Sequence, residues 1–332
     1  MALLAAAAAA LATASASLQG LYAVSAGEGQ LLFIDPDAGT VTHVGQPLSK
    51  SGLQVAACAP ALVQQTNKWY FTLATNTTAP DDVHLVGMDL ADGSIVDFKT
   101  LPSNIFPQTL GMCDYTLDVD GGLVVFVTAV VDDRLVTLRV EPKGETAQRV
   151  RKVPQYGINA SVVLNVSVPD LDLGSTVQFP SSTILPSGDL WYQLENGVVG
   201  HNVVSGKYLN HLKFDGDSTI FSGLAFSQSS SHVHGILQTR SSGASATEQT
   251  SVVAQFDPVS NAPQLQTGNA SVPAVERDGS ATALMADHAQ IAVVSGSKLL
   301  VLDLNNGDQL ESTSICKGKL CPSSIGYLPY VF

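Results

Sequence analysis

A strand-rich unit recurs along the 332-residue chain, and this repeat limits the fold more than any other feature of the sequence. Each unit opens with a short apolar run rich in β-branched and aromatic residues, which is typical of a buried strand. The six opening runs lie at residues 21–24, 69–72, 123–127, 190–193, 233–237 and 291–294. Internal repetition of this kind indicates a repeat architecture and not a single irregular core.

A second strand follows in every unit and ends in a turn signal. The turn segments are rich in Asp, Asn, Pro and Gly, and they lie at residues 35–39, 91–93, 142–144, 205–206, 257–261 and 305–307. Because Asp and Asn cap tight turns and Gly tolerates positive φ, each segment predicts a hairpin that leads to a third strand. The third strands have mixed polarity, which suits an outer edge with one face in water.

A fourth, less polar strand precedes each later unit. These segments lie at residues 52–61, 109–119, 176–185, 219–228 and 280–289. The first unit lacks such a strand, but the C-terminal segment 323–332 resembles one. We therefore predict an all-β fold, a six-bladed β-propeller of four-stranded antiparallel blades whose first blade is closed by the C-terminal strand. A pair of β-sandwiches, or a seventh blade that uses the insertion at 154–174, remains as an alternative.

The hairpin at residues 33–45 and its echoes at 88–98 and 302–312 resemble the repeating unit of the quinoprotein-like and YVTN-type β-propeller superfamily. The shared pattern is a strand, an Asp-rich turn, a Gly and a second strand. The resemblance extends over nearly all of the chain after the N-terminal segment. It implies architecture only, and it assigns no active-site residue.

The N-terminal segment and four glycosylation sequons predict export. Residues 1–16 form an Ala-rich apolar run that ends in Ala14-Ser15-Ala16, which fits a signal peptide and leaves one propeller domain at 17–332. An Ala-rich helix of a cytosolic protein is the alternative. The sequons start at Asn76, Asn159, Asn165 and Asn269. We expect a secreted or secretory-lumen glycoprotein, monomeric and without a membrane span.

The four cysteines predict two disulfides in an oxidising compartment. Cys58 and Cys113 occupy nearly equivalent places on neighbouring predicted strands. Cys316 and Cys321 bracket four residues just before the C-terminal strand. The preferred pairing is therefore Cys58 with Cys113 and Cys316 with Cys321, although a buried, unpaired Cys58 and Cys113 remain the alternative.

The charge balance excludes one class of partner. The formal net charge is −13, so the surface repels phosphate backbones and nucleic acid is not expected as a ligand. A cationic ligand remains compatible with this charge. No cofactor is predicted, although Ca²⁺ stays open, because many acids fall in loops predicted to gather at one mouth of the ring. These acids are Glu28, Asp81, Asp82, Asp132, Asp133, Asp170, Asp172, Glu195, Asp215, Asp217, Glu276 and Asp278. Polar loops in an acidic protein give the simpler explanation.

Candidate binding residues come from the starts of the inner strands and from the mouth loops. They are Gln54, Gln108, Ser222, Asp215, Asp217, Glu276 and Asp278. Asp114, Asp287 and His288 are weak catalytic candidates. A catalytic metal needs several carboxylates or imidazoles around one ion, and no such set is identifiable. His232 and His234 share a strand face at a chelating spacing, but they are better explained as a surface pair.

The sequence thus favours a secreted binding or interaction module whose ligand is a protein, a peptide or a carbohydrate. Aromatic candidates for stacking on a sugar are Trp69, Tyr70, Trp191 and Tyr192, although aromatic residues at such strand positions more often belong to the core. The alternative function is a secreted hydrolase or lyase with its site at the propeller mouth.

Overall fold

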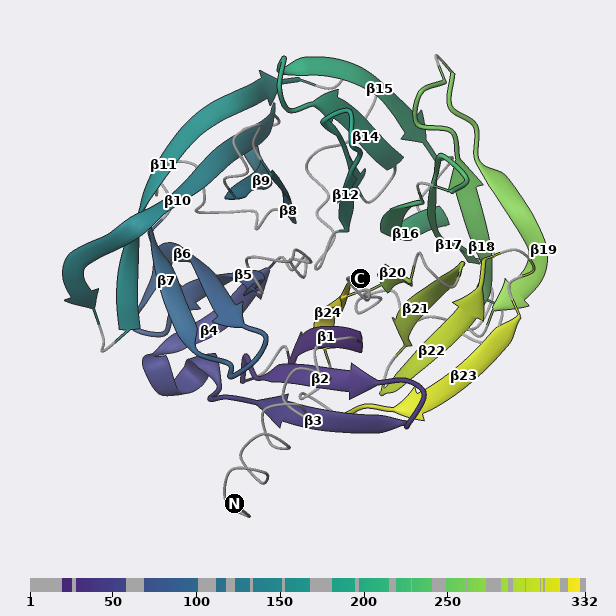
Figure 1. Ribbon diagram of the computed structural model, residues 1–332. Helices are drawn as coiled ribbons and strands as arrows, with labels where there is room; N and C mark the ends of the chain where they lie inside the picture. Colours follow the sequence, from purple (N-terminus) through teal and green to yellow (C-terminus); the bar gives the residue numbers. More distant parts are fainter. Residues whose placement is uncertain are drawn as a thin grey trace, which may run out of the picture.

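β-Strands make up nearly all of the regular structure (Figure 1). The structure is a computed structural model, and it describes residues 20–25, 28–57, 69–100, 112–117, 123–131, 134–150, 153–167, 181–194, 197–214, 219–227, 229–240, 249–260, 262–272, 282–285, 289–295, 297–304, 306, 308–316 and 322–328. Over these residues the helical structure is one short 3-10 turn, η1 (Leu48–Ser51). No helix in this part of the chain is long and apolar enough to cross a membrane.

The described strands form four sheets of four strands and one sheet of eight, in which two antiparallel four-stranded units are joined by a parallel pairing. We call the resulting six four-stranded units the first to sixth sheets. The first sheet has the order β24 (Pro322–Leu328), β1 (Gly20–Ser25), β2 (Leu31–Asp35) and β3 (Thr40–Val44). The second contains β4 (Leu53–Ala57), β5 (Trp69–Asn76), β6 (Ala79–Asp89) and β7 (Ile95–Thr100). The third contains β8 (Met112–Leu117), β9 (Leu123–Val131), β10 (Arg134–Val150) and β11 (Val153–Val166).

The remaining three sheets are simple meanders in chain order. The fourth contains β12 (Ser182–Ile184), β13 (Asp189–Leu194), β14 (Gly197–Asn202) and β15 (Lys207–Lys213). The fifth contains β16 (Thr219–Ser227), β17 (His232–Arg240), β18 (Gln249–Phe256) and β19 (Gln266–Val272). The sixth contains β20 (Thr282–Met285), β21 (Gln290–Ser295), β22 (Lys298–Asp303) and β23 (Gln309–Ser314).

The sheets are arranged around a common centre, and β8, β12, β16, β20 and β24 lie nearest to it (Figure 1). The inner strands β8, β12, β16, β20 and β24 each lie beside the next. At the inner edge of the first sheet, β24 pairs with β1, so that Tyr327 lies opposite Leu21 and Ile325 opposite Ala23. The last described strand of the chain therefore shares a sheet with the first, and the fold is all-β and propeller-like.

The core lies in the seams where neighbouring sheets pack face to face. Side chains of a strand alternate between its two faces, so a middle strand with a sheet on each side must be apolar throughout. In β1, Leu21 and Ala23 pack toward the sixth sheet, whereas Tyr22 and Val24 pack toward the second. Similar apolar clusters fill the third–fourth, fourth–fifth and fifth–sixth seams. This burial on both faces explains the uninterrupted apolar runs of the sequence.

One predicted turn is wrong. Residues 142–144 form no hairpin, because β10 runs through them to Val150 and pairs along its length with β11. A register shift between Lys143 and Glu145 absorbs the local turn signal as a bulge. The segment considered as part of a seventh unit instead supplies β11, the outer strand of the third sheet. A parallel contact between Gln155 and Asp97 joins β11 to β7 of the second sheet.

Two glycines bring the first and second sheets into backbone contact. Gly45 follows β3 and Gly93 lies in the turn between β6 and β7, and their φ angles are +65° and +68°. A Cβ built on Gly45 would lie 2.6 Å from the Cα of Gly93, and a Cβ on Gly93 would lie 2.6 Å from the Cα of Gly45. Only residues without a side chain satisfy both the left-handed backbone and this approach.

We expect Gly93→Ala to lower the free energy of unfolding by about 2–5 kcal/mol, since it combines backbone strain with overpacking. Gly39→Ala is the matched control: Gly39 has φ +62°, but the nearest atom to its added Cβ is 3.8 Å away. It should cost only the strain, about 1–2 kcal/mol. Urea unfolding of both variants measures the difference, and equal losses would contradict the importance of the contact.

Candidate functional site

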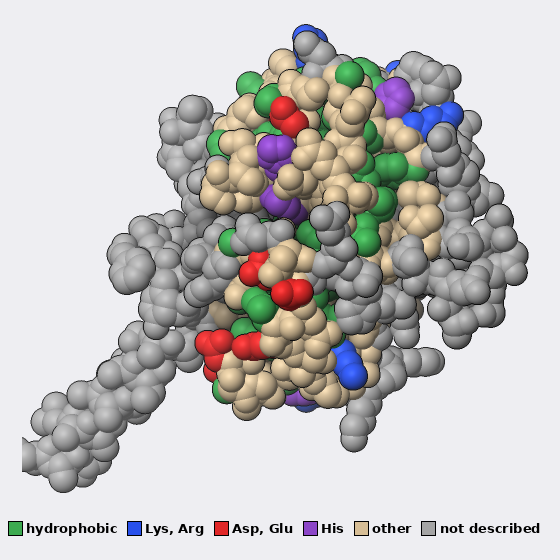
Figure 2. Space-filling view, turned by 90° about the vertical axis from the view of Figure 1, so that its right-hand side faces the viewer, with side chains coloured by type: hydrophobic (Ala, Val, Ile, Leu, Met, Phe, Trp, Pro, Cys, Tyr) green, Lys and Arg blue, Asp and Glu red, His purple; other side chains and the backbone are tan. Residues whose placement is uncertain are grey.

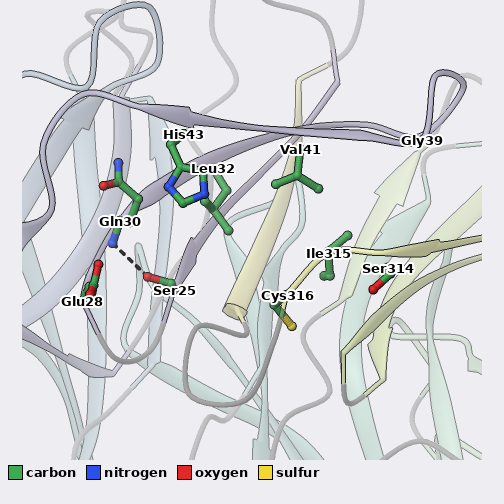
Figure 3. A pocket seen from close by; sticks show the side chains of 10 residues that line it. All are labelled: Ser25, Glu28, Gln30, Leu32, Gly39, Val41, His43, Ser314, Ile315 and Cys316. Atoms are coloured by element: carbon green, nitrogen blue, oxygen red, sulfur yellow. Dashed lines mark hydrogen bonds between the residues drawn. The ribbon is translucent and has the colours of Figure 1, made fainter.

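A groove of about 350 Å³ lies between the first and sixth sheets (Figure 3). It is lined by Ser25, Glu28, Gln30, Leu32, Gly39, Val41, His43, Ser314, Ile315 and Cys316. Most of these residues belong to β1–β3 and their connections, and the last three lie at the end of β23. The groove therefore joins segments from the two ends of the chain, and its volume is at the small end of the range for ligand pockets.

Strand register sets the face of the first sheet that lines the groove. Leu32 on β2 lies opposite His43 on β3, and Ile34 lies opposite Val41. Since cross-strand partners point to the same face of a sheet, Leu32, Val41 and His43 share the face toward the sixth sheet. Leu32 and Ile315 are buried and form an apolar floor, whereas His43 is exposed.

The loop that carries Glu28 is held by hydrogen bonds to its own sheet and to η1. The backbone N–H of Gln30 donates to Ser25 Oγ at 3.0 Å, and Gln30 Nε2 donates to the carbonyl of Val44 at 2.8 Å. The N–H of Ser49 donates to the carbonyl of Glu28 at 3.2 Å. Gln30 is buried, so its amide ties the loop to the end of β3 away from solvent. The carboxylate of Glu28 thus stands on a fixed backbone at the groove rim.

Glu28 and His43 are the two ionisable side chains of the groove. Both are exposed, and neither side chain makes a hydrogen bond or ion pair within the described part of the chain. A carboxylate accepts hydrogen bonds and attracts cations, and an imidazole donates or accepts according to its protonation state. The groove thus offers two free polar groups above an apolar floor, which is the composition expected of a small binding site.

The histidine pair on β17 differs from its prediction. His234 is 4% exposed, so the pair is not a surface pair. Its Nε2 lies 2.9 Å from Ser230 Oγ, which has the geometry of a nucleophile and a base. Burial, with a smaller contribution from His232, lowers the pKa of His234 to about 4. A base this weak abstracts a serine proton poorly at neutral pH, so Ser230 and His234 do not form an efficient catalytic dyad.

A second buried imidazole lies in the third–fourth seam. His201 is 0% exposed, and its ring centroid lies 5.6 Å from that of Tyr192 in an edge-on arrangement. Neither ring nitrogen of His201 nor the hydroxyl of Tyr192 has a hydrogen-bond partner among the described residues. Burial lowers the pKa of His201 to about 4, although Asp189 acts in the opposite direction. The folded protein therefore holds this imidazole neutral.

This burial predicts a loss of stability in acid. The pKa of His201 is about 4 in the folded protein and 6.5 without burial, so its contribution to stability is fully present above pH 6.5. That contribution is lost as the pH falls from 6.5 toward 4. We expect His201 to lower the free energy of unfolding by about 2 kcal/mol between pH 7 and pH 5, measured by urea titration.

The matched variants are His201→Phe, which removes the buried titrating group, and His43→Phe, which changes an exposed one. In His201→Phe, the fall in the free energy of unfolding between pH 7 and pH 5 should be smaller by about 2 kcal/mol, whereas His43→Phe should show the same fall as the unsubstituted protein. An identical pH dependence in His201→Phe and the unsubstituted protein would rule out this origin.

None of the sequence-predicted binding and catalytic residues is among the described residues that line the groove. Gln54 lies in β4 opposite Thr75 and is exposed. Ser222 lies in β16 and Asp114 in β8 opposite Phe126, and the structure does not describe their side chains. The other predicted residues lie outside the described part of the chain: Gln108, Asp215, Asp217, Glu276, Asp278, Asp287 and His288. On the side of β17–β19, Figure 2 shows backbone and uncharged polar side chains over much of the described surface, with two neighbouring histidines and several acidic side chains among them.

The sequence identified Glu28 as a loop acid but missed Gln30, His43 and Ser314. No local pattern marks these residues, because tertiary packing alone brings β3 and the end of β23 together. The proposed sugar-stacking role is wrong for Tyr70, Trp191 and Tyr192, since all three are fully buried in the seams. The side chain of Trp69 lies outside the described set.

The sequons differ in their surroundings. Asn76 is 5% exposed, and its Oδ1 accepts hydrogen bonds from Thr78 N at 3.0 Å and Thr78 Oγ1 at 2.9 Å. Asn165 is exposed, and its Oδ1 accepts from Arg134 Nε. The side chains of Asn159 and Asn269 are not among those described.

The described side chains include that of one of the four cysteines and those of some residues that could bind a metal ion. Cys316 is disulfide-bonded, but its partner is not among the described side chains, so the predicted pairing of Cys316 with Cys321 and of Cys58 with Cys113 stays a prediction. Within the described residues, no group of three or more His, Cys, Asp or Glu side chains is arranged to hold a metal ion.

Comparison with known proteins identifies no family. No protein-family model and no curated protein matches the chain. Among solved structures, a hypothetical selenium-binding protein from Sulfolobus tokodaii gives a TM-score of 0.49 at 9% identity, over 90% of this chain and 75% of that one. An oligogalacturonate lyase in complex with manganese gives 0.43 at 11% identity, over 89% and 85%. Raptor of Chaetomium thermophilum gives 0.45 at 8%, over 85% and 27%. At these TM-scores the likenesses support no argument about function.

Proposed function

We propose that the protein is a binding module whose ligand occupies the groove between the first and sixth sheets. The observation that carries this proposal is the pair of free ionisable groups, Glu28 and His43, above the buried floor of Leu32 and Ile315. Hydrogen bonds at Gln30 hold the backbone of the loop that carries Glu28, so a ligand meets a prearranged loop. Prearrangement lowers the entropic cost of binding.

The architecture that we propose for this module is a six-bladed propeller. Each four-stranded sheet is one blade, and β24 completes the first blade beside β1. In this arrangement the groove lies at the junction where the two ends of the chain meet. The ligand classes that suit the groove are a protein segment, a peptide or a carbohydrate. Ca²⁺ bound by the acidic loops is the alternative ligand.

The alternative of a hydrolase or lyase has less support from the described side chains. Ser230 and His234 have suitable geometry, but the lowered pKa of His234 makes it a poor base at neutral pH. Binding requires no such base, and the exposed side chains of the groove are sufficient for it.

The binding proposal predicts a specific loss of affinity. The full chain is screened on glycan and peptide arrays, with 1 mM CaCl₂ or EDTA, and each hit is measured by calorimetry. We expect Glu28→Gln combined with His43→Ala to weaken binding at least about tenfold, equivalent to about 1.4 kcal/mol, because both polar contacts are removed.

Asp37→Asn is the matched control, since it removes an exposed carboxylate outside the groove lining. It should bind as the unsubstituted protein does, and all variants should keep the same thermal midpoint. If every hit binds the double variant with unchanged affinity, the groove is not the ligand site.

We also propose that the protein is secreted and glycosylated. The support is the Ala-rich segment 1–16, the four sequons and the even cysteine count. Expression in a eukaryotic secretory host should release a chain that begins at Ser17, and peptide-N-glycosidase should reduce its mass. An intracellular product that retains residues 1–16 and carries no glycan would contradict export.

A further inference from the structure

The outer edge of the first sheet is open beside the groove along residues 40–43, whereas its end at Gly45 contacts Gly93 of the second sheet. Within the described strands, β3 has a neighbour, β2, on one side only. Thr40, Thr42 and His43 are exposed on this strand. An edge strand presents unpaired N–H and C=O groups, which are a template for pairing with another chain. In the third sheet the outer strand β11 instead contacts β7 of its neighbour.

The composition of β3 favours pairing of this edge with an additional strand. Its sequence is Thr-Val-Thr-His-Val, in which four of five residues are β-branched and none is Lys, Arg, Asp or Glu. Proteins commonly guard exposed edges with charged side chains or proline. The outer strand β15 begins and ends with Lys207 and Lys213, and β23 contains Glu311. The edge strand β3 has no charged residue or proline that would disfavour the addition of another strand, and its residues favour strand pairing.

A strand added to β3 would lie along the groove. Val41 and His43 point into the groove from alternate positions of β3, as Figure 3 shows. Side chains of an added strand alternate in the same way, so every second one would extend over this face. Five residues of such a strand span about 17 Å, which is the length of β3. The carboxylate of Glu28 stands at the rim, where it can receive a basic side chain.

We propose that β3 accepts an extended peptide as an additional strand, and that a Lys or Arg of this peptide pairs with Glu28. This inference rests on the proposed binding role of the groove and names its ligand class. Backbone hydrogen bonds to the edge of β3 would supply affinity that depends little on sequence. Contacts with Val41, His43 and Glu28 would supply selectivity.

Charge favours a basic peptide over a second copy of this chain. Each copy carries a formal net charge of −13, so two copies repel one another. A copy of β3 added at this edge would also bring no Lys or Arg to meet Glu28. A cationic peptide instead gains from both the overall charge and the local carboxylate.

The test selects peptides from a displayed library of random dodecamers on the full-length protein. We expect selected sequences to alternate apolar or β-branched residues and to contain Lys or Arg. Replacing that residue by Gln in the peptide, or making Glu28→Gln in the protein, should each weaken binding about tenfold. Two sets of peptides are made, with N-methyl groups on the odd or on the even backbone amides. One set should lose binding, because the methyl groups replace the N–H groups that donate to β3, and the other set should keep it.

Thr42→Lys tests the edge without altering the groove lining, because Thr42 is exposed and does not line the groove. The added charge should weaken the selected peptide at least tenfold, whereas Asp37→Asn should leave its affinity unchanged. Thermal midpoints confirm that the variants fold.

The outcomes separate this inference from the proposed function. Failure to select any peptide, indifference to backbone N-methylation in both registers, or full affinity in Thr42→Lys would overturn strand addition. Self-association that Thr42→Lys abolishes in sedimentation would overturn it in favour of a second copy. A glycan that loses affinity in the Glu28→Gln/His43→Ala variant would leave the groove as a binding site and remove the peptide as its ligand.

Discussion

Face-to-face packing of neighbouring sheets is the constraint on which the rest of this structure depends. Each middle strand is buried on both faces, as Leu21 and Tyr22 show by packing in opposite directions from β1. No sheet would be stable alone, because each has two apolar faces that need cover. The seams therefore fix the order and spacing of the sheets. They also require small residues where backbones meet, as at Gly45 and Gly93.

The seams contain polar groups as well as apolar ones, and the effect of each polar group depends on how deeply it is buried. His201 and Tyr192 lie at the full depth of the third–fourth seam, where their polar atoms lack partners in the described chain. Such groups are costly to bury, and charging the imidazole of His201 is more costly still, so this residue makes the fold sensitive to acid. At the first–sixth seam the polar groups of Glu28 and His43 stay at the rim. There they keep their contact with water and remain free to bind a ligand.

The groove owes its position to the packing of the first sheet against the sixth. β24 joins β1 at the inner edge of the first sheet, and Ser314, Ile315 and Cys316 at the end of β23 line the groove together with residues of β2 and β3. The same sheet leaves β3 open at its outer edge. A site with an exposed carboxylate, an apolar floor and an open strand edge therefore forms between the first and sixth sheets.

The sequence by itself determined the strands and their grouping. Apolar runs with period-two or continuous patterns and Gly-rich turns report local backbone preference, so most inner, middle and outer strands were predictable, whereas the outer strand of the third sheet was not. It failed at residues 142–144, where pairing with β11 overrode a local turn signal. It also failed at His234, whose burial depends on a neighbouring sheet. Only the tertiary structure decided the groove, because Glu28 and Ser314 become neighbours through seam packing, which no local pattern encodes.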